Sequence, residues 1–118
     1  MHLKDRLGRY GEAVAAQLLA DRGYQILRRN WRCARGEIDI IAALDRTLII
    51  CEVKTRSGTA FGDPAEAVDR TKAARLRLLA AQYLIEHPGG WDDIRFDVVT
   101  VLRPAAGPAQ VEHLQAAF

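Results

Sequence analysis

Two neighbouring stretches, GEIDIIA at residues 36–42 and LIICEVKTR at residues 48–56, decide how the chain is interpreted. The first holds three Ile, the second holds two Ile and one Val, and both are short enough for buried strands. Asp45 and Arg46 lie between them and predict a tight turn. The two stretches therefore predict a β-hairpin.

Charged residues interrupt both apolar runs. Side chains alternate across a strand, so Glu52 and Lys54 share one face of the second strand. In the first strand Asp39 points away from the face shared by Ile38 and Ile40. The pairing of the two strands then allows a register that brings Asp39 near Glu52 and Lys54.

Two carboxylates in a half-buried sheet repel each other and are costly to bury unless they are compensated. A divalent cation such as Mg²⁺ compensates them, and a nearby ammonium can orient an attacking water or offset charge on phosphorus. Asp39, Glu52 and Lys54 together suit phosphodiester hydrolysis. The alternative is that Glu52 and Lys54 form a surface ion pair worth under about 1 kcal/mol.

The rest of the chain predicts an α/β fold in which helices flank a mixed β-sheet, in the order α-β-β-β-α-β. A length of 118 residues favours one domain over residues 1–118. The expected elements are a helix over Leu3–Arg22 stopped by Gly23, strands over Tyr24–Trp31, Glu37–Ala43 and Thr47–Thr55, a helix over Asp69–His87, a strand over Ile94–Leu102, and a last short strand or apolar tail over 111–118.

The segment RSGTAFGDP, residues 56–64, predicts a loop. Gly58 and Gly62 suit either a loop that orders on binding a duplex or a turn that needs glycine's backbone freedom. Asp63 to Glu66 resembles a helix capping box.

Composition excludes several classes of protein. The sequence contains no apolar stretch of about 18 residues, the length that would predict a membrane-spanning helix. The N-terminus does not resemble a secretion signal. Cys33 and Cys51 lack the spacing of a zinc or redox motif, and we expect reduced thiols. A cytoplasmic location is the default expectation.

Basic residues are concentrated near the N-terminus. Residues 1–35 hold eight basic and three acidic side chains, although the whole chain has a net charge of only +2. Fourteen of the 17 basic residues are Arg, the side chain that forks onto phosphates. This asymmetry suggests an anionic partner, and a solvated basic surface is the plain alternative.

The residues also resemble a known family. GEIDIIA followed by LIICEVKTR resembles the PD-(D/E)XK nuclease motif, as Asp39…Glu52-Val53-Lys54. The resemblance also covers the segment from Gly8 to Ala42, Lys72, and RFDVV at 95–99. Taken together, these residues resemble the YraN-like family of predicted endonucleases, which are similar to archaeal Holliday-junction resolvases. Ile38 stands where the motif has proline.

This resemblance implies a restriction-endonuclease-like core and roles for individual residues. Asp39 and Glu52 would be metal ligands for Mg²⁺ or Mn²⁺, Lys54 would position water, and Glu12 matches the helical acid of junction resolvases. A solvent-facing helix position is the alternative for Glu12. Glu37 would be a supporting acid or a solvated strand residue.

The function implied is a metal-dependent endonuclease that hydrolyses DNA phosphodiester bonds, on duplex or branched substrates. The expected phosphate contacts are Arg28, Arg29, Arg32, Arg35, Arg56 and Lys72. Resolvases of this kind act as homodimers, and a monomer that needs an unidentified protein partner is equally compatible. The alternative function is a non-catalytic nucleic-acid-binding adaptor. Retention of Asp39, Glu52 and Lys54 together favours the enzyme.

Overall fold

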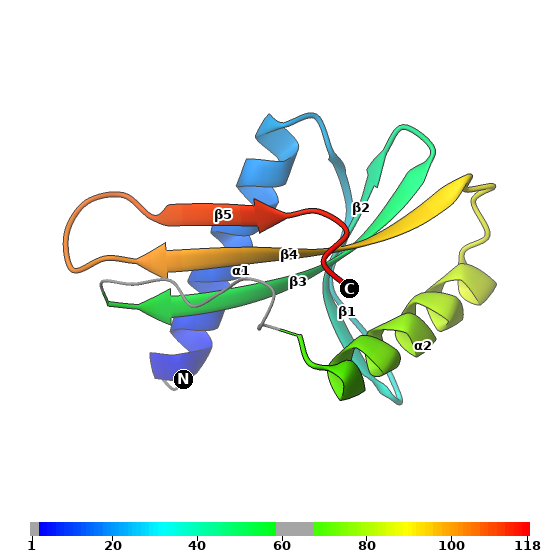
Figure 1. Ribbon diagram of the computed structural model, residues 1–118, viewed down its shortest axis with the longest axis horizontal. Coiled ribbons are helices and arrows are strands. Elements are labelled where there is room, and N and C mark those ends of the chain that lie inside the picture. The colour runs from blue at the N-terminus through cyan, green and yellow to red at the C-terminus, as the bar shows by residue number, and fades with distance from the viewer. Residues whose placement is uncertain (1–2, 59–67) are drawn as a thin grey trace.

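The computed structural model describes residues 3–58 and 68–118. In chain order it has α1 (Leu3–Asp21), β1 (Gln25–Cys33), β2 (Gly36–Leu44), β3 (Thr47–Ser57), α2 (Arg70–Glu86), β4 (Asp93–Arg103) and β5 (Gln110–Leu114). The five strands form one mixed sheet with a helix on each face (Figure 1). This architecture confirms the α/β prediction and is compatible with a restriction-endonuclease-like core.

The sheet follows the chain order β1-β2-β3-β4-β5. Neighbouring strands are antiparallel except β3 and β4, which are parallel. A parallel pair needs a crossover connection, and the segment that contains α2 provides it. The predicted hairpin is confirmed, because β2 and β3 pair from Leu44↔Thr47 to Ile40↔Cys51.

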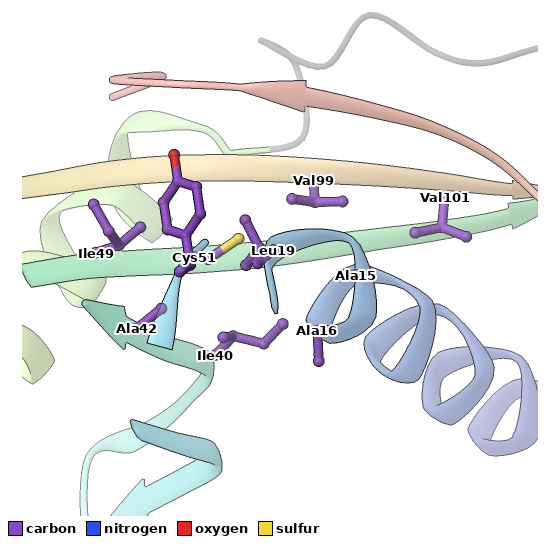
Figure 2. Packing of buried hydrophobic residues seen from close by; sticks show 10 residues of the cluster. Ala15, Ala16, Leu19, Ile40, Ala42, Ile49, Cys51, Val99 and Val101 are labelled. Carbon is purple, nitrogen blue, oxygen red and sulfur yellow. The ribbon is translucent and has the colours of Figure 1, made fainter. Parts of the chain in front are cut away.

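Helix α1 covers the first face of the sheet. Ala15, Ala16 and Leu19 are buried against residues of β2, β3 and β4 (Figure 2). The helix ends as predicted at Gly23, whose φ of 91° is a conformation that glycine adopts without strain. Earlier in the helix, a Cβ at Gly11 would lie 1.7 Å from Thr55 Oγ1, so Gly11 allows α1 to approach β3 closely.

Helix α2 covers the opposite face. Leu76, Leu79 and Tyr83 pack there with Trp31 of β1 and with residues of β2, β3 and β4. The rings of Trp31 and Tyr83 meet edge to face at 5.5 Å between centroids. The helix starts one residue later than predicted, because Asp69 is its N-cap.

One prediction about strand faces is wrong. Ile38 and Ile40 were expected on the same face, but Ile38 packs with the α2 cluster and Ile40 with the α1 cluster. The alternation breaks at Asp39, where the pairing of β2 with β3 ends. The neighbouring β1 residue Asn30 has a φ of 52°, outside the strand region.

Other expectations have mixed outcomes. The C-terminal segment forms a short strand, β5, and the two cysteines are free thiols. The predicted capping box at Asp63–Glu66, Gly62 and most of the loop prediction lie outside the described residues. Within residues 3–58 and 68–118, no helix is long and apolar enough to cross a membrane.

Candidate functional site

Asp39 and Glu52 lie where β2 separates from β3. The last paired residues are Ile40 and Cys51, and Asp39 and Glu52 come next along the two strands. Beyond the last paired residues, the side chain of Asp39 serves as the hydrogen-bond acceptor for the backbone of β3. Its Oδ2 accepts a hydrogen bond of 2.9 Å from Val53 N. Both acids are buried, with 9% of Asp39 and 8% of Glu52 exposed.

The electrostatics of this pair are unfavourable. Burial, followed by the negative charge of Glu52, raises the pKa of Asp39 to about 7, against the opposing effect of the Val53 N–H. The carboxyl group of Asp39 therefore changes between its protonated and ionised forms near neutral pH. A cation that binds both carboxylates would favour the ionised form of Asp39.

The ammonium that contacts this pair belongs to Lys72. Its Nζ lies 2.7 Å from Glu52 Oε1, and Lys72 is in the first turn of α2. The backbone of Lys72 is held as well, since its N–H donates to Asp69 Oδ1 at 2.8 Å. The predicted role of Lys72 is a phosphate contact, and in this structure its ammonium pairs with Glu52.

Lys54 has a different environment from the one expected. It follows Glu52 on the same side of β3, but its side chain is exposed and does not line the hollow beside the acids. It makes no ion pair with any residue that the structure describes. Its position leaves the ammonium accessible to a substrate.

A hollow of about 530 Å³ adjoins the acid pair. It opens between β2, β3 and the N-terminal half of α2. Its charged lining residues are Glu37, Asp39, Glu52, Asp69, Lys72 and Arg75. Acids and bases therefore share one concave surface, which suits a ligand that carries both a cation and a phosphate.

Glu12 lies in a neighbouring hollow of about 550 Å³, and Glu37 lines both hollows. Burial raises the pKa of Glu12, a hydrogen bond with Asn30 opposes this, and the charge of Asp39 adds to the rise. The structure therefore places Glu12 near Asp39, on the α1 side. In the described parts of the chain, no three His, Cys, Asp or Glu side chains are arranged to hold one metal ion.

The basic residues predicted to contact phosphate remain on the surface. Arg32 pairs with Glu37 at 2.9 Å, with 76% of the Arg32 side chain exposed. The other predicted arginines, also exposed, are Arg28, Arg29, Arg35 and Arg56. They lie on β1, on the β1–β2 turn and at the end of β3.

Three residues of this region were not predicted from the sequence. Asp69 and Arg75 line the hollow from α2, and Asn30 lines the second hollow beside Glu12. Asn is one of the few residues that adopt a positive φ readily, so an Asn inside an Arg-rich strand was the available signal for a backbone irregularity. Only the three-dimensional fold reveals that α2 faces the acids.

A third buried acid, Asp97 of β4, is fully enclosed. Its oxygens accept hydrogen bonds from Arg95 at 2.8 Å, from His113 Nε2 at 2.8 Å and from Ala116 N at 3.0 Å. Burial acts to raise the pKa of Asp97, but these donors outweigh it and hold the pKa below its usual value.

Comparison with known proteins identifies the family. The model of the uncharacterised protein family UPF0102 matches residues 11–101, so the chain belongs to this family, which is the YraN-like family. A UPF0102 protein of Frankia alni is 57% identical over 118 residues, covering 100% of this chain and 98% of that protein. UPF0102 proteins of Beutenbergia cavernae and Nocardia farcinica are 53% and 50% identical over 115 residues, covering 98% of this chain and 98% and 91% of theirs.

Proposed function

We propose that this UPF0102 chain is a metal-dependent endonuclease that hydrolyses phosphodiester bonds in DNA. The observation that carries the proposal is the pair of buried acids, Asp39 and Glu52, at the point where β2 and β3 separate. An acid whose pKa is raised to about 7 beside a hollow is a candidate for function rather than for stability. The resemblance to the PD-(D/E)XK motif supports the same assignment.

The donor set fits Mg²⁺ or Mn²⁺. Mg²⁺ takes hard oxygen ligands and commonly binds through one or two carboxylates, with waters and substrate phosphates completing the shell. Asp39 and Glu52 provide two such carboxylates beside a hollow of about 530 Å³. A bound Mg²⁺ would supply Lewis acidity toward the phosphodiester.

The chain's own residues then have separate tasks. Asp39 and Glu52 would hold the cation, and Lys54 would position the attacking water from the exposed part of β3. Lys72, 46% exposed and already beside Glu52, binds the substrate phosphate. The water oxygen forms a bond to phosphorus and one ester P–O bond breaks. One water proton passes to solvent and the leaving oxygen gains a proton.

DNA is the substrate that the charge distribution supports. The exposed arginines on β1 and the β1–β2 turn lie on the strand next to β2, which carries Asp39. Arginine forks onto phosphate oxygens, and contacts of this kind give nucleic-acid binding a steep dependence on salt. Branched or junction DNA is the specific form suggested by the resemblance to resolvases.

A cleavage assay tests the proposal. Linear, flapped and four-way DNA are incubated with Mn²⁺ and wild-type protein, Asp39→Asn, Lys54→Ala or the control Glu112→Gln. Glu112 is an exposed acid on β5, distant in the sheet order from β2. We expect cleavage by wild type and Glu112→Gln, and a loss of at least about 100-fold in the other two.

Equal product from all four proteins would mean contamination and would contradict the proposal. Salt-sensitive DNA binding without cleavage, in wild type as well as in the variants, would instead support a non-catalytic adaptor.

A further inference from the structure

Helix α2 is apolar on two opposite sides. Its inner side is buried against the sheet through Leu76, Leu79, Ala80 and Tyr83. Its outer side also carries apolar residues, and these face solvent. Leu78 is 57% exposed and Ile85 is 75% exposed.

The exposed residues form one stripe rather than a scatter. Ala74, Leu78, Ala81 and Ile85 are spaced by four, three and four residues and are all exposed. This spacing keeps them within an arc of roughly 60° on the helix, and the centre of that arc is about 180° from the buried side. We call these four residues the outer stripe. Single exposed leucines are ordinary, but a stripe over three turns is the pattern of a helix–helix seam.

The outer stripe is complementary in size to itself. Small and large side chains alternate along it, in the order Ala74, Leu78, Ala81, Ile85. An antiparallel copy related by a twofold axis between Leu78 and Ala81 places Ala74 opposite Ile85 and Leu78 opposite Ala81. Each large side chain then meets a small one, and interfaces about a twofold axis require this kind of self-complementarity.

The charges of α2 are complementary in the same orientation. Its four basic residues, Arg70, Lys72, Arg75 and Arg77, all lie in the first half, and its one acid, Glu86, ends the helix. An antiparallel copy brings the basic half of each helix beside the acidic end of the other, with Arg75 and Glu86 on the same side of the outer stripe. A parallel copy would instead align the basic halves, which repel.

We propose that the outer stripe is an interface between two copies of this chain, formed by antiparallel packing of α2 on α2. The inner side of the helix, with Lys72 on Glu52, is not used by this contact. The interface is one helix face, a smaller contact than the roughly 800 Å² per partner of standard complexes, and we expect a dimer that dissociates at micromolar concentrations. The inference is independent of the nuclease proposal, since the outer stripe holds none of the proposed catalytic or metal-binding residues and the test measures association.

Sedimentation equilibrium of the full chain tests the interface, at concentrations from about 1 to 200 μM. We expect wild type to pass from monomer to dimer and Leu78→Asp to remain monomeric. Leu114→Asp is the control, because Leu114 is an apolar residue, 36% exposed, that belongs to β5 and not to the outer stripe. Circular dichroism confirms that each variant is folded, and Ile85→Asp replaces Leu78→Asp if the latter does not fold. A wild-type monomer at every concentration, or dimers of both folded stripe variants, would overturn the inference.

A charge swap tests the antiparallel orientation. Arg75→Glu and Glu86→Arg should each weaken dimerisation by roughly tenfold, since each places like charges across the twofold axis. The double variant should return dimerisation to near the wild-type level, because the opposite charges then face each other again. A double variant as weak as the sum of both single changes would overturn the antiparallel arrangement.

Discussion

Two buried carboxylates of the same sheet have opposite environments. Asp97 is 0% exposed and accepts hydrogen bonds from Arg95, His113 and the Ala116 N–H. Asp39 is 9% exposed, accepts one from Val53 N, and has a second acid as its neighbour. The pKa is lowered for Asp97 and raised to about 7 for Asp39.

The difference separates stability from function. A buried carboxylate with enough donors stays ionised and links the segments that supply them, here β4 and the β5 end of the chain. A buried carboxylate that lacks donors weakens the fold unless a ligand compensates it. Asp39 adjoins a hollow and Asp97 is fully enclosed, so only Asp39 can receive such a ligand.

The largest effect is expected from Asp97→Ala. Removing this acid leaves Arg95 and His113 without their shared acceptor, and breaking a buried ion pair from one side costs about 3–5 kcal/mol. Urea denaturation at pH 7 measures the free energy of unfolding, with Glu112→Gln as the control. A loss below about 1 kcal/mol would mean that Asp97 does not stabilise the fold.

Asp39→Asn should have the opposite sign and stabilise the protein at pH 8, by about 2 kcal/mol. The folded pKa of Asp39 lies above the unfolded value, so the wild type loses stability as pH rises from about 4 to about 7, and Asn does not. The gain should therefore be largest above pH 7 and smallest below pH 4. Denaturation curves of wild type and Asp39→Asn across this pH range measure the difference in their free energies of unfolding. A variant less stable than wild type at pH 8 would contradict the prediction.

Affinity for Mn²⁺ should depend on pH through the same group. Binding requires ionised Asp39, whose pKa is raised to about 7, so affinity should fall by roughly tenfold per pH unit below that value. Calorimetric titrations between pH 5.5 and 8.5 measure the dependence. A constant affinity over this range would show that Asp39 is not a ligand.

The smallest effect is expected from Lys72→Met. The ammonium of Lys72 lies 2.7 Å from Glu52 and competes with a cation for that oxygen. Removing it should tighten Mn²⁺ binding by about fivefold, while DNA binding becomes weaker because a phosphate contact is lost. Arg70→Met, an exposed residue of the same helix turn, is the matched control and should leave Mn²⁺ affinity unchanged. Weaker Mn²⁺ binding by Lys72→Met would contradict the competition.

Local pattern predicted most of the fold. The hairpin of β2 and β3, both helices and the stop at Gly23 were all anticipated, because apolar periodicity and turn residues act over short distances. Alternation also predicted correctly that Asp39 and Glu52 meet. It failed at Ile38, since alternation assumes a regular strand and β2 is irregular at Asp39.

The contacts of the site depend on distant segments, and they were predicted less well. Lys72 reaches Glu52 only because α2 crosses the sheet beside the acids, and no spacing in the sequence encodes that distance. The Asp97 cluster was missed for the same reason, since it joins Tyr24, Arg95 and His113 from three separate parts of the chain. The sequence could supply the residue types but not their pairing.

Titration calorimetry with Mn²⁺ at pH 8 tests the central claim, that Asp39 and Glu52 form a site for a divalent cation. Wild type and Glu112→Gln should bind one ion per chain, and Asp39→Asn should show no binding although it remains folded. Absence of binding to wild type, or equal binding by wild type and Asp39→Asn, would contradict the claim.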